Sequence, residues 1–309
     1  MAAADRSKDD RPGSRRLDEV AVDAALRRMV RAPEPPWLHG EVARRLGERL
    51  GPIRAEPRRI LDWWASVGGG EAVLRSIYPR AEIVPVERDA ADAAVRSERR
   101  KRAPWWSLAR SRGAPVVSAA AGDAEIGRCQ LVWANMVLPF VADPPALFER
   151  WHGLLEVEGL AVFSCLGPGS LRELRELYAE AAWPSPAAEF VDMHDLGDML
   201  VHAGFADPVL DQETLTLRWK SGEALLAELR QLGGNAAPDR FAGLRTPAWR
   251  RRLLAALAKR ADGDGSIGLS VEVAYGHGFK TGPRLRPGAP VAVPLDDMRA
   301  MVRRPRPSR

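Results

Sequence analysis

Apolar residues recur along this chain with two alternating periods. Leu38, Val42, Leu46 and Leu50 are spaced by four, which predicts one face of a helix. Short apolar runs then alternate with helical patterns. The predicted strands are 59–64, 81–87, 114–119, 129–135 and 160–165, and the predicted helices are 71–78, 89–99, 144–155, 170–181 and 192–203. Because strands that alternate with helices form parallel sheets covered on both faces, we predict a Rossmann-like α/β fold.

The pattern changes after residue 208. Two long strands are predicted, 208–219 and 267–279, and the second alternates like a terminal strand of the sheet. Two helical segments, 221–232 and 247–260, lie between these strands. They interrupt the sheet pattern, so we expect them to form a small helical cap at about 221–260.

Composition divides the chain into three parts. Residues 1–36 are charged and end in a proline-rich segment, which is typical of a partly disordered N-terminal arm. Residues 37–282 carry the periodic patterns and form the expected domain. Residues 283–309 are rich in proline and arginine without periodicity, which predicts a disordered basic tail.

Other features of the composition narrow the class of protein. No apolar run reaches the roughly 18 residues of a membrane span, and the polar start lacks the apolar segment of a signal peptide. We therefore expect a soluble, cytoplasmic protein. Cys129 and Cys165 lie in apolar runs, which favours buried thiols over a disulfide. The five histidines are not spaced as metal ligands, so no metal site is predicted.

The net charge of +5 allows an acidic partner, and basic residues gather in 96–112. This stretch has two interpretations. It is either a solvated loop or a surface that captures an acidic protein or a nucleic acid, with Trp105 and Trp106 as contacts. The nucleic-acid interpretation rests on charge alone and is the weaker one.

The segment 59–71 has the outline of a nucleotide-cofactor loop. A strand ends in Asp62, a glycine cluster from Gly68 to Gly70 follows, and a helix begins at Glu71. Glu87 ends the next strand, near the interval at which an acidic residue meets a ribose hydroxyl. Dinucleotide sites need a Gly-x-Gly-x-x-Gly cradle for the pyrophosphate, and this chain has none. An adenosyl cofactor without phosphates therefore fits better.

Several segments resemble a known family. Residues 131–148 look like the fourth strand and following loop of class I S-adenosylmethionine-dependent methyltransferases. Residues 167–174, 191–205 and 225–236 are similar to the malonyl-acyl-carrier-protein O-methyltransferases of biotin synthesis, the BioC family. The resemblance covers roughly 37–280. It implies a mostly parallel sheet whose last strand is antiparallel, and S-adenosyl-L-methionine as the cofactor.

The resemblance also assigns roles to four residues. Asp62 takes the place of the acidic residue that ends the first strand, and Gly68 that of the last glycine of the loop. Glu87 matches the acid that binds the ribose hydroxyls of S-adenosylmethionine. Asn135 matches the fourth-strand asparagine near the amino-acid end of the cofactor.

The chain departs from the family pattern at the loop. Trp64 and Ser66 replace its first two glycines, although glycine there allows positive φ and a close approach of the backbone. Ser118 stands at the usual adenine-contact position, and Asp123 could substitute for an acid there.

The reaction that the resemblance implies is transfer of a methyl group to the free carboxylate of a malonyl-acyl-carrier-protein thioester. A carboxylate is already an anion near pH 7 and needs no general base, so we name no catalytic residue. The acidic carrier protein would dock on the basic stretch 96–112.

Two alternatives stay open. One is a pseudo-methyltransferase whose crevice is closed by Trp63 and Trp64 and which binds a partner. The other is changed chemistry on the same fold, since a scaffold does not dictate its reaction. Some BioC-like relatives act as respiratory-complex assembly factors, among them an arginine hydroxylase.

Overall fold

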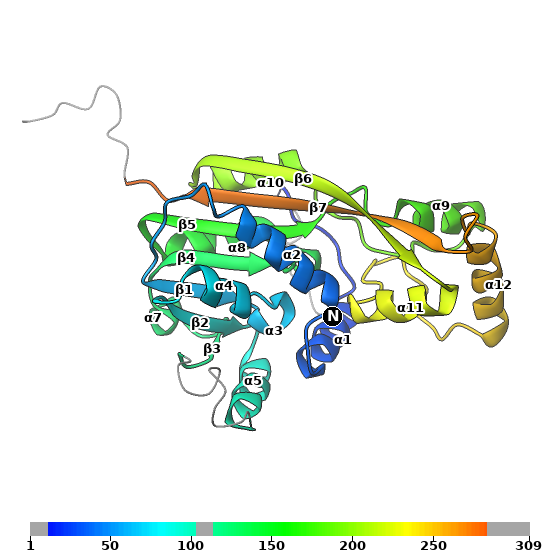
Figure 1. Ribbon diagram of the computed structural model, residues 1–309, viewed down its shortest axis with the longest axis horizontal. Helices are drawn as coiled ribbons and strands as arrows, with labels where there is room; N and C mark the ends of the chain where they lie inside the picture. The colour runs from blue at the N-terminus through cyan, green and yellow to red at the C-terminus, as the bar shows by residue number, and fades with distance from the viewer. Residues whose placement is uncertain (1–11, 103–113, 283–309) are drawn as a thin grey trace, which may run out of the picture.

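The computed structural model describes residues 12–102 and 114–282. Within them, seven strands form one sheet in the order β3-β2-β1-β4-β5-β7-β6 (Figure 1). The strands are β1 Arg59–Trp63, β2 Glu82–Glu87, β3 Val117–Ser118, β4 Cys129–Asn135, β5 Leu155–Leu166, β6 Ala206–Trp219 and β7 Ile267–Phe279. Strands β1 to β5 pair in parallel, and β7 is antiparallel to both β5 and β6. The predicted Rossmann-like sheet with an antiparallel last strand is confirmed.

Helices cover both faces of this sheet. They are α1 Glu19–Arg31, α2 Trp37–Glu48, α3 Ala65–Gly68, α4 Glu71–Ile77, α5 Ala90–Arg102, α7 Asp123–Ile126, α8 Pro144–Leu154, α9 Arg172–Glu180, α10 Met193–His202, α11 Gly222–Gln231 and α12 Pro247–Ala258, with a 3₁₀ turn η1 at Leu138–Phe140. Neighbouring residues of β1 show the two layers. Ile60 packs in the cluster that contains α2 and α4, whereas Leu61 packs in the cluster that contains α8 and α10. Successive side chains of a strand point to opposite faces, so both faces are buried.

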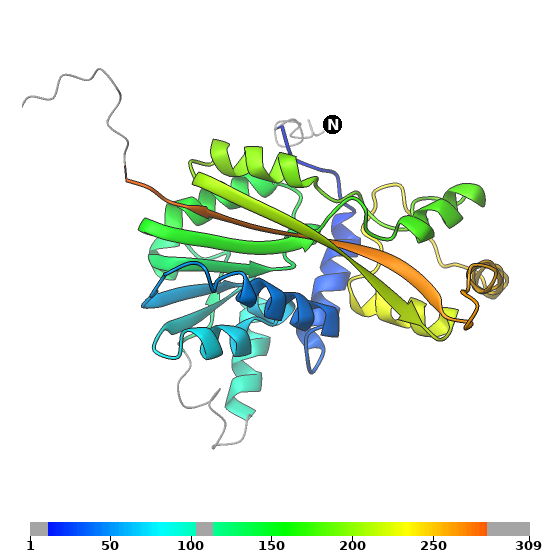
Figure 2. The ribbon, with the colours of Figure 1, turned by 45° about the horizontal axis from the view of Figure 1, so that its top comes forward.

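The cap is built on the far ends of the two longest strands. β6 and β7 run beyond the other strands toward α9, α11 and α12, as Figures 1 and 2 show. Trp219, at the end of β6, and Ile267, at the start of β7, share an apolar cluster with Leu225 of α11 and Leu253 of α12. The helices expected near 221–232 and 247–260 are therefore present, and α9 joins them.

The N-terminal arm is not peripheral from residue 12 onward. Helix α1 begins at the N-cap Asp18, whose carboxylate accepts a hydrogen bond from the Ala21 backbone N–H at 2.9 Å. Its buried face contacts α3 and α5 (Figure 2). Two ion pairs hold it, Asp18 with Arg240 of the cap at 2.6 Å and Asp23 with Arg88 after β2 at 2.6 Å. The helix is thus part of the fold, and the rest of the arm, 1–11, lies outside the described residues.

A second anchor of this arm is Arg15. Its guanidinium donates to four backbone carbonyls, those of Leu138, Pro139, Val141 and Glu189. Burial lowers the pKa of Arg15 to about 10, so it remains charged at neutral pH. The arm is therefore attached at the turn η1, next to the end of β4.

The remaining predictions concern the cysteines, metal and membrane segments, the loop after β1 and the C-terminal tail. Cys129 and Cys165 are free and buried, as expected, and burial raises the pKa of each thiol to about 12. No group of candidate metal ligands occurs in the described residues, and none of the helices there is long and apolar enough to cross a membrane. Between the end of β1 and the helix at Glu71 the structure has a short helix, α3, that the sequence pattern did not predict. The tail 283–309 lies outside the described residues.

Candidate cofactor crevice

Three polar side chains lie at the carboxyl ends of adjacent strands. Asp62 is the penultimate residue of β1, Glu87 ends β2 and Asn135 ends β4. Strand β1 lies between the other two. Ligands of open α/β sheets bind at this edge. Gly68 ends the short helix α3 directly after β1, so the structure brings all four predicted residues to the expected edge.

Asn135 is held by hydrogen bonds within the protein. Its Nδ2 donates to the Gly68 carbonyl at 2.6 Å and to the His39 carbonyl at 2.8 Å, and its Oδ1 accepts from Ser164 Oγ at 2.6 Å. Gly68 packs against the same strand end, because a Cβ there would lie 3.0 Å from the Asn135 carbonyl oxygen. The Asn135 side chain therefore joins α2, α3 and β5 around the crevice.

Glu87 is also engaged. Its Oε1 accepts hydrogen bonds from the Ser66 backbone N–H at 2.9 Å and from Ser66 Oγ at 2.7 Å. Arg96 of α5 donates to Ser66 Oγ at 3.2 Å and lies 3.5 Å from Glu87 Oε1. Arg96 also pairs with Glu71 at 2.6 Å. We call Ser66, Glu71, Glu87 and Arg96 the crevice lock.

The charge of Glu87 results from two opposing effects. Burial raises the pKa of its carboxyl group, and the neighbouring Arg96 and the two bonds from Ser66 oppose that rise. The carboxylate that the resemblance assigns to the ribose hydroxyls is thus turned toward the chain's own loop and helix α5.

Asp62 differs from Glu87 in its hydrogen bonding. It is fully buried, and neither carboxyl oxygen has a hydrogen-bond partner in the described residues. Burial raises the pKa of Asp62 to about 8, so the neutral acid predominates at pH 7.

The two tryptophans after Asp62 differ in their surroundings. Trp63 is 1% exposed and belongs to the core, where it meets Trp151 edge to face with ring centroids 6.1 Å apart. Trp64 is left-handed, with φ of 52° and ψ of 52°, a conformation that costs a residue other than glycine roughly 1 to 2 kcal/mol. Its backbone N–H donates to the Val86 carbonyl at 2.6 Å. The strained Trp64 turns the chain from β1 into α3.

Helix α1 covers this end of the sheet. Leu26 and Met29 of α1 share an apolar cluster with Val67 of α3, and Trp64 and Phe140 pack against that cluster. Beneath this cover, the side chains of Asp62, Glu87 and Asn135 are each at most 1% exposed. In this conformation the residues do not fit a bound adenosyl cofactor, because the carboxylate that would receive the ribose is bonded internally.

The sequence pattern pointed to two other residues at this edge, and the structure places Ser118 there but not Asp123. Ser118 ends β3 and pairs in register with Glu87 of β2. Its Oγ accepts a hydrogen bond from the Ala120 backbone N–H at 3.1 Å. Asp123 begins α7 and pairs with Arg150 of α8 at 3.0 Å.

Arg96 was missed as a residue of the crevice. It begins the basic stretch 96–112, but no sequence signal shows that it turns inward to Glu71 and Glu87. Residues 103–112 of this stretch, with Trp105 and Trp106, lie outside the described residues. The amphipathic pattern of Val22, Leu26 and Met29 could have shown that α1 packs on the domain.

Curated relatives match nearly the whole chain. The malonyl-[acyl-carrier protein] O-methyltransferase of Laribacter hongkongensis is 35% identical over 271 residues, which cover 86% of this chain and 88% of the relative. The enzyme of that name from Gallionella capsiferriformans is 37% identical over 281 residues, with 89% and 96% covered. This chain belongs to the malonyl-acyl-carrier-protein O-methyltransferase family. The resemblance to the BioC family is confirmed, and the chain is therefore a member of a methyltransferase family.

Other comparisons add little. No family model matches the chain. Among solved structures, the YcgJ protein of Bacillus subtilis has a TM-score of 0.49 at 10% identity, covering 77% of this chain and 98% of that one. Phosphoethanolamine N-methyltransferase 2 of Haemonchus contortus has a TM-score of 0.45 at 15% identity, with 85% and 58% covered. Likenesses this weak carry no argument, so the fold rests on the strand order.

Proposed function

We propose that this chain is an S-adenosylmethionine-dependent O-methyltransferase that acts on the free carboxylate of a malonyl group carried by acyl carrier protein. The observation that carries the proposal is the identity of 35% and 37% to relatives of that name over most of both chains. The meeting of Asp62, Glu87 and Asn135 at adjacent strand ends supports it.

The proposed reaction requires little acid–base catalysis from the protein. S-adenosylmethionine would supply the methyl group, and the malonyl carboxylate is an anion near pH 7 that needs no base. What remains for the chain is to orient the acceptor and exclude water. Helix α1, with Leu26 and Met29 over the strand ends, supplies an apolar cover of the kind that excludes water.

The closed conformation sets a condition on this function. Glu87 has to leave Ser66 before it can bind a ribose, so only an opened fraction of the protein takes the cofactor. The apparent dissociation constant is then the intrinsic one divided by that fraction. We therefore expect S-adenosylmethionine to bind more weakly than to a protein with a glycine at position 66.

Calorimetry with S-adenosylmethionine tests the proposal. We expect saturable binding of one cofactor per chain, lost in Glu87→Ala and kept in Glu82→Ala, which changes a carboxylate at the start of the same strand. A wild-type protein that shows no binding at millimolar cofactor would refute the proposal.

A second function is favoured by one specific observation, the crevice lock. A chain that permanently closes its crevice with Ser66, Glu87 and Arg96 would use the fold to bind a partner without cofactor. This second function predicts that S-adenosylmethionine binds neither the wild type nor any variant in which Glu87 is released from Ser66.

The carrier protein would bind near the last turn of α5. This turn carries Arg99, Arg100, Lys101 and Arg102, and Arg100 donates to the Ala114 carbonyl at 2.5 Å. Reversing Arg99 and Lys101 to glutamate should therefore weaken carrier-protein binding while preserving that contact. We expect the loss to shrink as salt is raised, because exposed charges are screened.

The control for this docking surface is the same reversal at Arg250 and Arg251 of α12, in the cap. Binding measured by surface plasmon resonance should change only in the α5 variant. Equal binding by both variants and the wild type would exclude docking on α5.

A further inference from the structure

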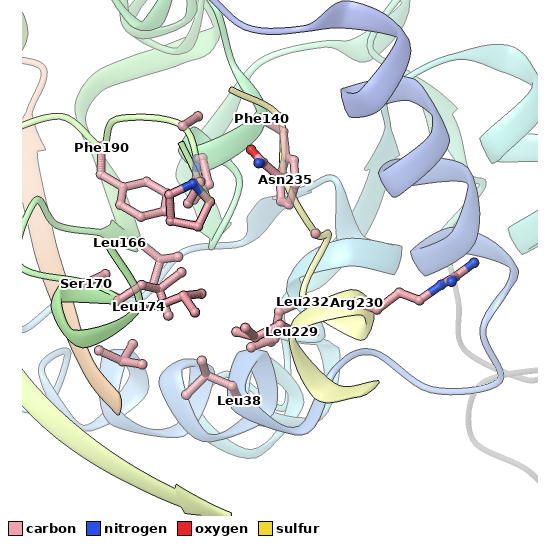
Figure 3. Close-up of a pocket in the computed structure, with 18 of the residues that line it drawn as sticks. Leu38, Phe140, Leu166, Ser170, Leu174, Phe190, Leu229, Arg230, Leu232 and Asn235 are labelled. Carbon is pink, nitrogen blue, oxygen red and sulfur yellow. The ribbon is translucent and has the colours of Figure 1, made fainter. Parts of the chain in front are cut away.

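A second hollow lies beside the crevice, between the sheet and the cap. It encloses about 230 Å³ and is bounded by η1, the end of β5, α9 and α11 (Figure 3). Neither Asp62, Glu87 nor Asn135 lines it. Its wall is mostly apolar, with Leu38, Phe140, Leu166, Leu174, Phe190 and Leu229 among the lining residues.

The Ser170 hydroxyl and the Asn235 amide of this wall already have hydrogen-bond partners within the protein. Ser170 Oγ donates to the Glu272 carbonyl at 2.9 Å and accepts from the Glu272 backbone N–H at 3.0 Å. Asn235 Nδ2 donates to the Ser185 carbonyl at 2.6 Å, while its Oδ1 accepts from the Ala237 backbone N–H at 2.8 Å. These groups offer little to a polar ligand, so the hollow favours an apolar one.

Two arginines lie where this hollow adjoins a larger one. Arg230 lines both the apolar hollow and a neighbouring hollow of about 620 Å³, which Arg28 of α1 also lines. Figure 3 shows the Arg230 guanidinium directed away from the apolar side chains and toward α1. Arg28 donates to the carbonyls of Ala24 at 3.0 Å and Gly233 at 3.1 Å.

Neither arginine forms an ion pair within residues 12–102 and 114–282, although Glu34 is among the residues that line the larger hollow with them. Burial, and then the charge of Arg230, lower the pKa of Arg28. An anion between the two guanidinium groups would relieve this repulsion.

We propose that this hollow is a binding site for a medium-chain carboxylate, with the chain among the leucines and the carboxylate at Arg230 and Arg28. A volume of 230 Å³ holds about eight groups the size of a water molecule or a methylene. A malonyl group is too short and too polar to fill it. The proposed ligand therefore differs in class from the malonyl acceptor, and its binding can be tested without the proposed reaction.

Calorimetry on the full chain, without S-adenosylmethionine, tests this site with decanoate, octanoate, decan-1-ol and malonate. We expect one decanoate per chain. Octanoate should bind roughly fourfold more weakly, because a hollow of about eight groups holds one more tail carbon of decanoate than of octanoate, and each buried methylene contributes about a fourfold factor. Malonate should not bind measurably.

Two variants separate the chain from the head group. Arg230→Gln should weaken decanoate about two- to fivefold, the range of a partly exposed ion pair, and leave decan-1-ol unchanged. Arg250→Gln, on a residue of α12 that does not line the hollow, is the matched control. Leu229→Trp fills the hollow from the half-buried face of α11 and should abolish binding of both decanoate and decan-1-ol.

Three results would contradict the proposed carboxylate site. The proposal is wrong if wild-type protein binds no decanoate, if decanoate binds Leu229→Trp as it binds the wild type, or if Arg230→Gln and Arg250→Gln behave alike. Because Arg230 is an exposed residue of α11, its variant should fold, and thermal unfolding verifies this for each protein.

Discussion

Replacement of Ser66 by glycine opens the crevice lock with the smallest change of structure. Ser66 gives Glu87 two hydrogen bonds, and the substitution removes the one from Oγ, at 2.7 Å, together with the acceptor of the Arg96 bond at 3.2 Å. Glu87 is 1% exposed, so water does not replace the lost bond in the closed state. The closed state should therefore lose stability relative to any state that frees Glu87.

The size of this effect follows from the kind of bond. A hydrogen bond to a charged group contributes about 1.5 to 3 kcal/mol. Even the lower figure changes the ratio of open to closed protein about tenfold. Because the apparent affinity scales with the open fraction while that fraction is small, Ser66→Gly should bind S-adenosylmethionine about tenfold more tightly than the wild type. Its free energy of unfolding should fall by about 1.5 to 3 kcal/mol.

Calorimetry gives the affinity, and urea unfolding gives the stability. Ser266→Gly is the matched control, since Ser266 Oγ donates to the Asp264 carboxylate at 2.7 Å in the loop between α12 and β7, outside the crevice lock. It should leave cofactor binding unchanged. The reasoning is refuted if Ser66→Gly binds the cofactor no more tightly than the wild type, because the lock would then not limit binding.

Three further predictions concern stability. The pKa of Asp62 is raised to about 8 in the folded protein, so its contribution to stability is present at low pH and lost as pH rises from about 4 to 8. In urea unfolding, the wild type should lose a few kcal/mol of unfolding free energy over this range, and Asp62→Asn should not. A variant with the same pH slope as the wild type would contradict the raised pKa of Asp62. The pKa of buried His39 is lowered to about 4, so its contribution to stability is lost as pH falls from about 6.5 to 4. His39→Asn should reduce the loss of unfolding free energy over this pH range. A loss equal to that of the wild type would show that His39 is not its cause. Gly70→Ala should lower the free energy of unfolding by about 1 to 3 kcal/mol, because its Cβ would overlap the Trp133 indole. The control Gly122→Ala places its Cβ where nothing lies within 4 Å and should leave stability nearly unchanged. Equal stability of the two variants would exclude the overlap.

The placement of the strand ends could be predicted from the sequence. Asp62, Glu87 and Asn135 each follow an apolar run, and the carboxyl ends of adjacent parallel strands meet at one edge. This is a consequence of chain order and of the alternation of strands and helices. It needs no knowledge of any side-chain conformation.

The state of the crevice could not be predicted in the same way. The bond between Ser66 and Glu87 joins residues 21 positions apart, and it forms because Trp64 turns left-handed and starts the short helix α3. No periodicity reports such a turn, since propensity disfavours it at a tryptophan. The inward direction of Arg96 likewise depends on how α5 packs and not on the basic run in which it lies.

The hypothesis that Trp63 and Trp64 together close the crevice needs revision. Trp63 lies in the core beside Trp151, on the face of the sheet that α8 covers. Trp64 packs between that core and the cluster of α1. The closure rests on the crevice lock and on α1, and Trp64 contributes by directing the loop.

Transfer of a labelled methyl group from S-adenosylmethionine to malonyl-acyl carrier protein tests the central claim most directly. The account predicts a methyl ester on the malonyl group, formed by the wild type and, at cofactor concentrations below saturation, faster by Ser66→Gly. The Laribacter hongkongensis relative, run in the same assay, verifies that substrate and conditions are competent. Ester formation by that relative, with none by the wild type or by Ser66→Gly, would contradict the account.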